Sequence, residues 1–387
     1  MNEFFDIVED DFDTKKKKFI EHMTFLKNMS VENQTFYKKY IEVQSYTNHI
    51  NNASIVKAKL WMPEDLNDED KTIKQIESVS PRVLYVQGKE LEMDWLMVRV
   101  FGHSMEFSQT PGRFLKYLID DGNGKYLGCL SISSDIISIG DRDKYIGWNQ
   151  DNKLKNNKRI NNSAIASCIM STQPFGYNFL GGKLMACLTT STTIRNKWKE
   201  LYDNVMAGIT TTSLYGAYSM YDRIPWWKFC GESAGKVPIR PDESYYKEWH
   251  EYVKEHYAQK YEEMMTQKEG VSGPVTGAKN RVMGLIFKEL GIKTSDYEHG
   301  YQRGVYYSCF YDNTREFLCD KIVEKDLKPK QNSSDEDKIK WWKKKAIQRY
   351  LNLKQQNRLK PETLFYNQMI GMSYDDAKNR YFADVGR

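Results

Sequence analysis

Apolar residues recur along the chain in two patterns, which predict a sheet in the middle of the sequence with helices before and after it. Short runs rich in β-branched and aromatic residues predict strands over residues 53–62, 82–86 and 95–100. A helix over residues 68–78 separates the first two of these strands. Longer and almost wholly apolar runs over residues 125–133 and 163–170 predict strands that are covered on both faces.

A strand, a glycine-containing loop, a helix and a second strand follow one another in the middle of the chain. The loop over residues 173–182 comes after the apolar run 163–170, and a helical pattern then extends from Leu184 to Leu201. Residues 205–213 predict the next buried strand. Such a unit places two neighbouring strands side by side. This segment is therefore the first candidate for an active or binding site.

The outer parts of the chain are helical and charged. We expect an α/β (α+β) fold, in which a mixed central sheet is flanked by helices. The expected parts are an N-terminal helical segment (1–52), a core (53–240), a helical insertion (241–300), a return to a core strand (301–325) and a C-terminal helical region (326–387) that begins with a basic helix. No internal repeat interrupts this order.

Composition narrows the class of protein. The 387 residues include 57 Lys and Arg against 52 Asp and Glu, with 40% hydrophobic residues and a mean hydropathy of −0.70. These values are typical of a soluble globular protein. No run approaches the roughly 18 apolar residues of a membrane span, and the N-terminus lacks the basic-then-apolar order of a signal peptide. We therefore expect a protein of the bacterial host cytosol, free or packaged in a virion, with no membrane partner.

The metal-ligating residue types are scattered. The six cysteines form no C-x-x-C pair, and the six histidines form no H-x-x-x-H pair. This spacing gives no support for a zinc site, so we predict no metal. Four of the cysteines lie within apolar runs, which favours reduced and buried thiols.

The loop before Leu184 is a candidate anion site. A glycine-containing loop that leaves a buried strand and enters a helix exposes backbone N–H groups at the positive end of that helix, where phosphate oxygens bind. The segment is neither G-x-x-x-x-G-K-[ST] nor G-x-G-x-x-G, which weakens ATP and NAD as ligands. Alternatively, Gly181 and Gly182 only allow the helix to pack close to the sheet. The spacing leaves both interpretations open.

The order of these elements, followed by Tyr221 and then Trp226-Trp227, resembles the core of the GNAT acyltransferase superfamily. In that superfamily the loop holds the pyrophosphate of coenzyme A. The resemblance implies an acyl-CoA or related pyrophosphate-containing donor as cofactor. The residues that it assigns to this cofactor are Gln173, Phe175, Gly176, Tyr177, Phe179, Leu180, Gly181, Gly182 and Lys183.

A closer resemblance covers residues 126–318. The motifs that carry it are Arg142-Asp143, Ile146-Gly147-Trp148, Asn161-Asn162-Ser163, residues 180–184, Tyr221 with Trp226, Gly231-Glu232-Ser233-Ala234-Gly235 and Val305-Tyr306. They are similar to those of the DruA family of Druantia anti-phage systems and its phage-encoded relatives. The pattern of that family has an acidic residue on the strand where this chain has residues 210–216, with the sequence TTTSLYG.

Three residues are candidates for catalysis. Tyr221 follows the strand over residues 205–213, where the GNAT resemblance implies a tyrosine that protonates the leaving thiolate of coenzyme A. A tyrosine near two tryptophans is more often a packing residue. Ser213 and Glu232 are further candidates. Ser213 has no histidine nearby in sequence to activate it, and a strand-end hydroxyl that caps a turn explains it equally.

Basic residues gather in two places that could bind nucleic acid. One is the loop with Arg142, Lys155, Lys158 and Arg159, and the other is the C-terminal helix with Lys343, Lys344 and Lys345, where tryptophans are interleaved. Each place has a plainer interpretation. The Arg142-Asp143 pair could lock its loop, and the lysines could be the solvent face of a helix that packs by its apolar face.

Two functions follow from these features. The first is an acyl- or aminoacyl-transferase of phage or defence origin that acts on a nucleobase or a nucleic-acid-associated amine, by analogy with Mom-type DNA modifiers. The second is a catalytically silent module that binds DNA or a protein partner, as a component of a defence complex or as a virion-packaged protein. The intact glycine loop favours the first function. The absent acid on the strand over residues 205–213 favours the second.

Overall fold

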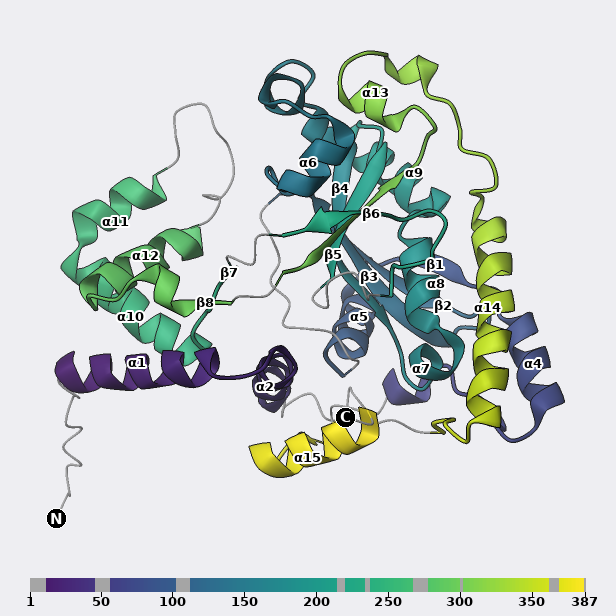
Figure 1. Cartoon of the computed structure of the whole chain (residues 1–387), viewed down its shortest axis with the longest axis horizontal. Helices are drawn as coiled ribbons and strands as arrows, with labels where there is room; N and C mark the ends of the chain where they lie inside the picture. Colours follow the sequence, from purple (N-terminus) through teal and green to yellow (C-terminus); the bar gives the residue numbers. More distant parts are fainter. Residues whose placement is uncertain are drawn as a thin grey trace. The chain divides into compact units, whose positions relative to one another are not determined.

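The computed structural model describes the chain in segments. The described residues are 12–45, 56–101, 112–213, 220–233, 237–266, 278–299, 302–361 and 369–385 (Figure 1). Contacts divide the chain into two compact units, each of which is described by itself. The smaller unit comprises Met1–Gln34 and Ala234–Tyr301, and the larger unit comprises Thr35–Ser233 and Gln302–Arg387.

A seven-stranded sheet forms the centre of the larger unit, with the order β1-β2-β3-β4-β5-β9-β6 (Figure 1). Its strands are β1 (Arg82–Tyr85), β2 (Phe114–Asp120), β3 (Tyr126–Ser134), β4 (Ser163–Ser171), β5 (Gly208–Ser213), β6 (Lys228–Glu232) and β9 (Gly304–Cys309). Neighbouring strands of this sheet are antiparallel except for β4 and β5. The predicted α+β fold is confirmed, as are the strands predicted over residues 82–86, 125–133, 163–170 and 205–213.

Helices pack on both faces of this sheet. Their bounds are α2 (Val31–Gln44), α4 (Glu69–Ser78), α5 (Lys89–Phe101), α6 (Gly140–Ile146), α7 (Phe175–Phe179), α8 (Gly181–Leu188), α9 (Thr192–Tyr202), α13 (Thr314–Leu318), α14 (Asp335–Gln355) and α15 (Tyr374–Val385). Shorter helical turns are η2 (Asp151–Lys155), η3 (Arg159–Asn162) and η5 (Glu324–Asp326). The helices predicted over residues 68–78 and from Asp335 are therefore present as α4 and α14.

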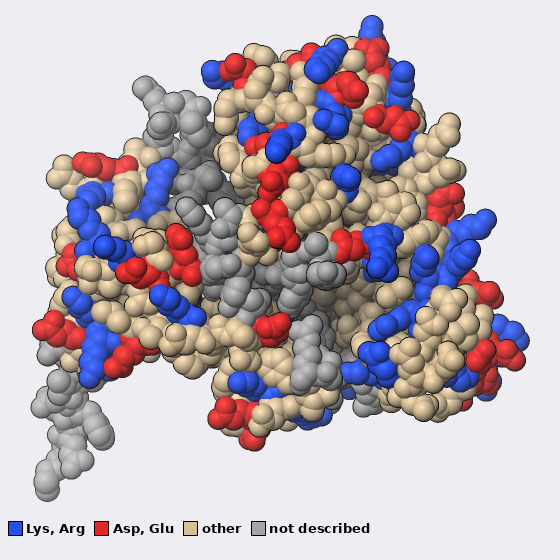
Figure 2. All heavy atoms as spheres, in the orientation of Figure 1, with Lys and Arg blue, Asp and Glu red and all other residues tan. Residues whose placement is uncertain are grey.

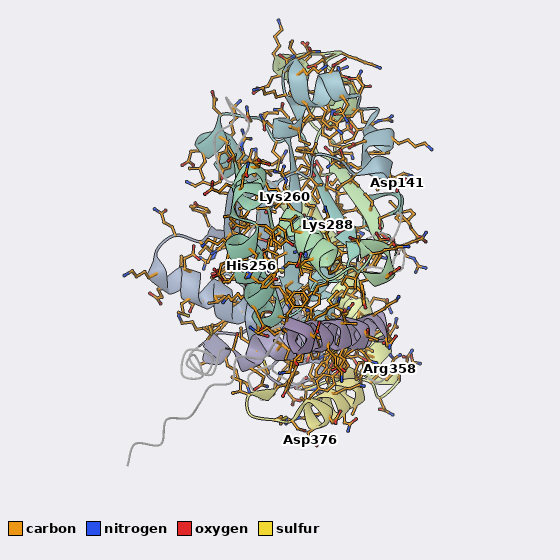
Figure 3. All side chains as sticks on the ribbon, turned by 90° about the vertical axis from the view of Figure 1, so that its left-hand side faces the viewer. Asp141, His256, Lys260, Lys288, Arg358 and Asp376 are labelled. Atoms are coloured by element: carbon orange, nitrogen blue, oxygen red, sulfur yellow. The ribbon has the colours of Figure 1, made fainter. Side chains whose placement is uncertain are left out.

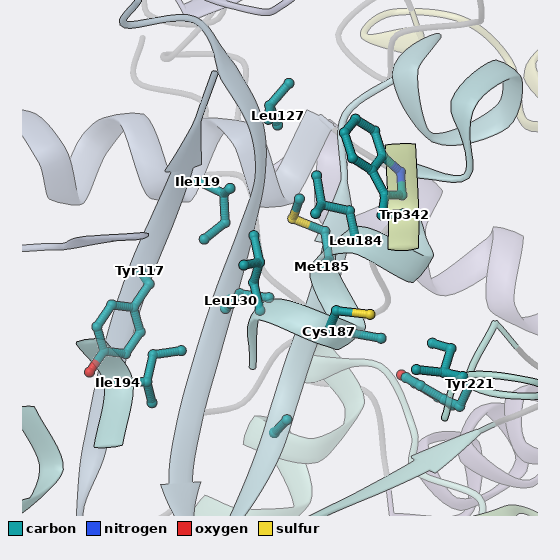
Figure 4. Close-up of a cluster of buried hydrophobic side chains, with 14 of the residues drawn as sticks. Tyr117, Ile119, Leu127, Leu130, Leu184, Met185, Cys187, Ile194, Tyr221 and Trp342 are labelled. Carbon is teal, nitrogen blue, oxygen red and sulfur yellow. The ribbon is translucent and has the colours of Figure 1, made fainter. Parts of the chain in front are cut away.

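Alternation along the strands divides the core into two layers. Leu130 and Ile132 of β3 face α7, α8, α9 and α14, and join a cluster with Met185 and Trp342 (Figure 4). Cys129 belongs to a second cluster, which α2, α5 and α15 complete. Because both faces are covered by helices, the strands β3 and β4 are apolar on both faces.

Two of the predicted strands are wrong. Residues 95–100 lie in α5, where Trp95, Met97 and Val98 are buried on the face of a helix. Of the strand predicted over residues 53–62, the described part forms a helical turn at residues 56–58 and a single bridge between Leu60 and Tyr126. Both runs were apolar because they are buried, and burial alone does not distinguish a strand from a helix.

The smaller unit is mainly helical. It contains α1 (Phe12–Lys27), β7 (Val237–Pro238), α10 (Glu243–His256), α11 (Ala258–Met265), α12 (Ala278–Glu289), η4 (Thr294–Tyr297) and β8 (Glu298–His299). Its core forms around the Phe19 ring, whose centroid lies 6.0 Å from that of Trp249 and 6.4 Å from that of Phe287. Charged residues such as Lys260 and Lys288 lie at the surface of these helices (Figure 3). This unit thus groups residues of the predicted insertion with the first helix of the chain.

Candidate functional site

The two parallel strands β4 and β5 separate after a short paired segment. Ser163, Ala164 and Ile165 pair with Gly208, Ile209 and Thr210, and the described register ends there. Just beyond this point, the Thr211 hydroxyl donates a hydrogen bond to the Ala166 carbonyl over 3.1 Å. The GNAT resemblance predicts the reacting groups of a transferase between these strands, and that placement stays a prediction.

Three serine hydroxyls meet at this part of the sheet. Ser131 pairs with Cys168 while Ile132 pairs with Ala166, so that Ser167 is the extra residue of a β-bulge. The Ser167 hydroxyl lies 2.8 Å from that of Ser131 and 3.0 Å from that of Ser133. Ser167 is exposed, whereas Ser131 and Ser133 are buried. This row was not predicted from the sequence, because a bulge depends on pairing between distant segments.

Tyr221 lies in the core beside β5 (Figure 4). Its ring centroid is 5.2 Å from that of Tyr306 and 5.6 Å from that of Trp227. Burial raises the pKa of the Tyr221 phenol to about 12, against the opposing effect of a hydrogen bond with Thr211. The phenol is therefore protonated at neutral pH. That state suits a proton donor and equally suits a packing residue, so the catalytic role of Tyr221 stays a prediction.

The other two catalytic candidates lie in one register row. Ser213 at the end of β5 pairs with Gly304, and Glu232 of β6 pairs with the same glycine from the other side. With one strand between them, the two residues are separated by ~10 Å of sheet. Ser213 is buried and Glu232 is exposed. Their catalytic roles also stay predictions.

The backbone of the predicted phosphate loop is already hydrogen-bonded within the chain. The loop folds into the short helix α7 and the start of α8, with Leu180 between them in the left-handed region at φ 54°. The Gly176 N–H donates to the Thr172 carbonyl over 2.8 Å, and the Tyr177 N–H to Oε1 of Gln173 over 3.0 Å. The Lys183 N–H donates to the Leu180 carbonyl over 2.9 Å.

Side chains also occupy the space around this turn. Phe175 and Phe179 are completely buried, and a Cβ atom on Gly181 would lie 2.5 Å from the ring of Phe175. Nε1 of Trp342, from α14, donates to the Phe179 carbonyl over 2.9 Å. Gly181 therefore permits close packing, as the second interpretation of the loop required. Binding of acyl-CoA by these residues stays a prediction and gains no support from this geometry.

Lys183 follows the two glycines, and its side chain is hydrogen-bonded within the protein. Its Nζ donates to the carbonyls of Met220 and Asp222 over 3.0 and 2.6 Å. Burial lowers the pKa of the Lys183 ammonium, and the charge of Asp222 opposes this shift. The side chain thus holds the segment after β5 against α8.

Arg142 is an internal ion-pairing residue, which corrects its assignment to a nucleic-acid-binding surface. Its side chain has no solvent exposure. Nη1 of Arg142 lies 2.6 Å from Oδ1 of Asp135, and Nη2 lies 2.6 Å from Oδ1 of Asp143. Oδ2 of Asp143 in turn accepts from Nζ of Lys153 over 2.6 Å. A guanidinium held in this way has no surface from which to reach a phosphate backbone.

Hydroxyl groups of two strands complete this ion network. Oδ2 of Asp135 accepts hydrogen bonds from Ser163 over 2.5 Å and from Thr210 over 2.8 Å. Burial raises the pKa of the Asp135 carboxyl, whereas the charge of Arg142 acts in the opposite direction. The network therefore ties the loop after β3 to the paired ends of β4 and β5.

The remaining basic residues of this loop differ in exposure. Lys155 is exposed and pairs with the exposed Asp151 over 2.9 Å, and Lys158 is also exposed. Nε of Arg159 donates to Oδ1 of Asp320 over 2.6 Å, and its guanidinium lies over the ring of Phe317. Of the loop residues assigned to nucleic acid, Lys155 and Lys158 are the most accessible.

The C-terminal helix α14 packs one face against the core and exposes several of its lysines on the other. Ser334 and Asp337 form a capping box at its start. The residues that anchor the helix to the core are Trp342, Ala346, Tyr350 and Leu353. Lys344 and Lys345 are exposed, whereas Lys343 is partly buried and donates to the Glu77 carbonyl. Sequence reasoning assigned all three lysines to nucleic acid, and the structure places two of them, Lys344 and Lys345, at an accessible surface.

Aromatic rings lie beside the exposed lysines. The Trp341 and Trp226 rings meet edge to face, with centroids 5.8 Å apart. We use the name basic–aromatic face for Lys340, Lys344 and Lys345 of α14 together with Trp341 and Trp226. Figure 2 shows blue side chains gathered over α14 and its surroundings, on the right of the view. Arg223, three residues before Trp226 in the chain, is also exposed.

Comparison with known proteins identifies the family of the chain. The family model described as Druantia protein DruA matches residues 35–320. The chain belongs to the DruA family. The Druantia protein DruA of Escherichia coli (strain UMEA 4076-1) is 25% identical over 272 residues, which cover 65% of this chain and 64% of that protein. The chain thus spans less than two thirds of the length of this curated relative. No solved structure matches the chain.

Three of the motifs that resemble the DruA family, those that contain Arg142, Trp148 and Ser163, lie at the buried ion network. Arg142, Asp143 and Ser163 belong to it, and the Trp148 ring lies 5.2 Å from the Arg142 guanidinium. Nδ2 of Asn162 donates to the Val205 carbonyl over 2.8 Å, just before β5. These contacts give the DruA motifs a structural role in holding β3, β4 and β5 together. The family model ends at residue 320, so α14 lies beyond the matched part of this DruA family member.

The described residues of this DruA family member offer neither a metal-ligating cluster nor a membrane-spanning helix. Within the described ranges, no group of three or more His, Cys, Asp or Glu side chains could hold a metal ion. Across the same residues, no helix combines the length and apolar character that crossing a membrane requires.

Proposed function

We propose that this member of the DruA family acts in anti-phage defence and binds nucleic acid through its basic–aromatic face. Family membership and the similarity to the Escherichia coli Druantia protein support the role in defence. The observation that carries the binding role is the exposure of Lys340, Lys344 and Lys345 beside the paired rings of Trp226 and Trp341. Cationic groups track a phosphate backbone and aromatic rings stack on bases, which is a common combination in proteins that bind single strands.

The helix that presents these lysines is held firmly. Trp342 and Tyr350 are completely buried, and the Tyr350 hydroxyl donates to the Leu66 carbonyl over 2.8 Å. A rigid support reduces the conformational entropy lost when a ligand binds. The solvent-facing lysines therefore project from a fixed scaffold rather than from a loop.

The electrostatic part of this binding has a predictable dependence on salt. Three lysines and Arg223 would neutralise about four phosphates, so the slope of log K against log salt should be roughly −3. Fluorescence anisotropy with labelled single- and double-stranded DNA between 50 and 200 mM salt measures this slope. Absence of binding even at the lowest salt would remove the nucleic-acid role and leave a protein partner in a defence complex.

Two variants that lose the same number of charges test whether DNA binds at the basic–aromatic face or binds to any basic surface. The test variant carries Lys340→Gln, Lys344→Gln and Lys345→Gln. The control carries Lys89→Gln, Lys144→Gln and Lys325→Gln, which remove three other exposed lysines of the larger unit. We expect the test variant to lose at least about tenfold in affinity and to show a shallower salt slope. An equal loss in the control would contradict the assigned surface.

A second candidate function is acyl transfer, which one observation favours. The parallel strands β4 and β5 follow the order that the GNAT resemblance implies, and they separate after three paired positions. In the proposed reaction, the acyl group moves from the sulfur of acyl-CoA to an amine of a nucleobase. The amine nitrogen bonds to the acyl carbon as the carbon–sulfur bond breaks, and the leaving thiolate takes the proton of the Tyr221 phenol. The proton lost by the amine passes to solvent, and a solvent proton restores the phenol.

Calorimetry with coenzyme A and acetyl-CoA tests this second function. Gly181→Asp is a poor probe of the loop, because any Cβ there would meet the Phe175 ring and disturb packing without a ligand. Tyr221→Phe keeps the ring and removes the proton. The expected result is donor binding that persists in Tyr221→Phe while transfer is lost. If neither compound binds the wild-type protein, transfer from coenzyme A is excluded.

A further inference from the structure

A small pocket lies at the end of β9, apart from the gap between β4 and β5. The pocket is partly open to solvent. The residues that line it are Thr190, Arg195, Trp226, Ser308, Cys309, Phe310, Ser333 and Lys338. All of them belong to the larger unit. Neither the proposed binding surface nor the proposed transfer reaction requires this pocket.

Two cations from different helices meet at the pocket. Arg195 comes from α9 and Lys338 from α14, and the Lys338 side chain is only 2% exposed. Burial lowers the pKa of the Lys338 ammonium, and the positive charge of Arg195 lowers it further. Asp335 is the opposing charge, with Oδ1 3.4 Å from Nζ of Lys338 and Oδ2 accepting from the Thr192 N–H over 3.1 Å. These groups therefore carry one excess positive charge.

Two polar atoms at the pocket lack partners. The Ser308 hydroxyl and Nε of Arg195 are buried and make no hydrogen bond to any residue that the structure describes. Ser308 is only 1% exposed and lines the pocket. Buried polar groups are nearly always hydrogen-bonded. A hydroxyl and a guanidinium N–H that both lack a hydrogen-bond partner at one pocket therefore indicate that a ligand binds there.

The starts of two helices add to the positive potential. Thr190 lies two residues before α9, and Ser333 lies two residues before α14. The N-terminal end of a helix carries a partial positive charge and attracts anions. The pocket thus combines two cations, two unused polar groups and two helix starts.

We propose that this pocket binds a phosphate group. The phosphate is either inorganic phosphate or the terminal phosphate of a nucleic-acid strand, which have the same tetrahedral oxyanion chemistry. Nε of Arg195, the Ser308 hydroxyl and the Lys338 ammonium supply hydrogen bonds from three elements, α9, β9 and α14. This proposal does not rest on the proposed function, since Arg195, Ser308 and Lys338 do not belong to the basic–aromatic face, although Trp226 borders both.

Thermal unfolding in sodium phosphate and in sodium chloride of equal ionic strength tests the proposal. We expect phosphate to raise the Tm in a saturable manner beyond the effect of chloride. Arg195→Gln should weaken this phosphate binding at least tenfold. Lys197→Gln on the same helix is the control and should leave it unchanged. If phosphate gives the wild-type protein no more stability than chloride, the proposal fails.

Ser308→Ala distinguishes a ligand group from a packing defect. The Ser308 hydroxyl has no protein partner, so its removal should not lower the Tm of the unliganded protein. Phosphate affinity should fall by about fivefold, as expected for loss of one hydrogen bond. Unchanged phosphate affinity in both Ser308→Ala and Arg195→Gln would overturn the proposal, even if phosphate stabilises the protein elsewhere.

Oligonucleotides identify the source of the phosphate. A 5′-phosphorylated strand is compared with the same strand ending in a 5′-hydroxyl. A preference of at least fivefold that disappears in Arg195→Gln assigns the pocket to a strand end, and no preference assigns it to inorganic phosphate. The variant lacking Lys340, Lys344 and Lys345 separates this proposal from the proposed function. It should bind DNA more weakly and keep the stabilisation by phosphate.

Discussion

Nη1 of Arg142 lies 2.6 Å from Oδ1 of Asp135, and neither side chain is exposed to solvent. The pair fixes the loop after β3 against β4 and β5, because Asp135 also accepts from Ser163 and Thr210. A buried ion pair adds little stability over an apolar pair, but removal of one partner leaves an uncompensated charge. The residues of this network, which include the DruA motif residues Arg142 and Ser163, are therefore sensitive to single substitutions.

Asp135→Asn tests this sensitivity. The free energy of unfolding should fall by about 3 to 5 kcal/mol, because Arg142 stays charged and loses a buried carboxylate. Urea unfolding followed by circular dichroism measures the change. Asp151→Asn is the control, since Asp151 pairs with Lys155 at the surface and should contribute about 1 kcal/mol or less. Equal effects of the two substitutions would show that burial does not determine the role of Asp135.

Lys39 predicts a dependence of stability on alkaline pH. Burial lowers the pKa of the Lys39 ammonium to about 8, although the charge of Glu42 3.3 Å away raises it. The unfolded chain holds this proton up to pH ~10.4, so between these values the unfolded state binds more protons. Stability due to this group therefore rises as pH increases from about 8 to 10, by on the order of 3 kcal/mol.

The measurement for Lys39 is the difference in free energy of unfolding between the wild-type protein and Lys39→Met across this pH range. Taking this difference cancels the pH-dependent contributions of the tyrosines and other lysines, because both proteins contain them. The wild-type protein should gain stability relative to Lys39→Met as pH rises. A difference that stays constant with pH would contradict the lowered pKa.

Two continuous apolar runs were correctly predicted as strands, and the helices that cover them explain why. The runs that form β3 and β4 are apolar on both faces because helices cover both faces of the sheet. The run over residues 95–100 has the same character, yet it lies in α5, since a short buried helix and a buried strand have similar composition. β6 lies at the edge of the sheet and has exposed residues, so its sequence KFCGE carries little strand signal.

The candidate sites were harder to predict because they depend on burial and register. A charged residue is exposed by default, so the sequence left open whether Arg142 locks its loop or faces a nucleic acid, and only the structure shows that its side chain has no exposure. Ser167 acquires its position from a bulge between β3 and β4, which local sequence does not encode. Arg195 and Lys338 are 143 positions apart and meet only because α9 and α14 both begin near β9.

Tyr221→Phe separates packing from proton transfer. The phenol is buried and hydrogen-bonded to Thr211, so the substitution should lower the free energy of unfolding by about 1 kcal/mol. Chemical unfolding measures this cost, with Tyr257→Phe at an exposed site as the control. A spectroscopic titration should show one fewer tyrosine ionising near pH 12 in Tyr221→Phe. If the lost tyrosine ionises near pH 10 instead, the phenol is accessible to solvent and the burial of Tyr221 is wrong.

Trp341 and Trp342 are adjacent on α14, but truncating each should affect a different property. Loss of Trp342 should lower stability, and loss of Trp341 should mainly weaken DNA binding. Trp342 is completely buried, contacts Phe175 at 5.5 Å between ring centroids and donates to the Phe179 carbonyl. Trp342→Ala should therefore lower the free energy of unfolding by about 3 to 5 kcal/mol. Trp341 is partly exposed and meets Trp226 at the basic–aromatic face. Trp341→Ala should cost about 1 kcal/mol and weaken binding of single-stranded DNA by the 1 to 3 kcal/mol typical of a lost stacking ring.

The two variants control for each other when unfolding and DNA binding are measured on the same preparations. A protein that has lost Trp342 but is still folded at low temperature should bind DNA nearly normally, because the basic–aromatic face keeps its own ring and its lysines. If Trp341→Ala leaves DNA binding unchanged, the ring does not stack on a base, and the lysines alone account for any affinity that depends on salt.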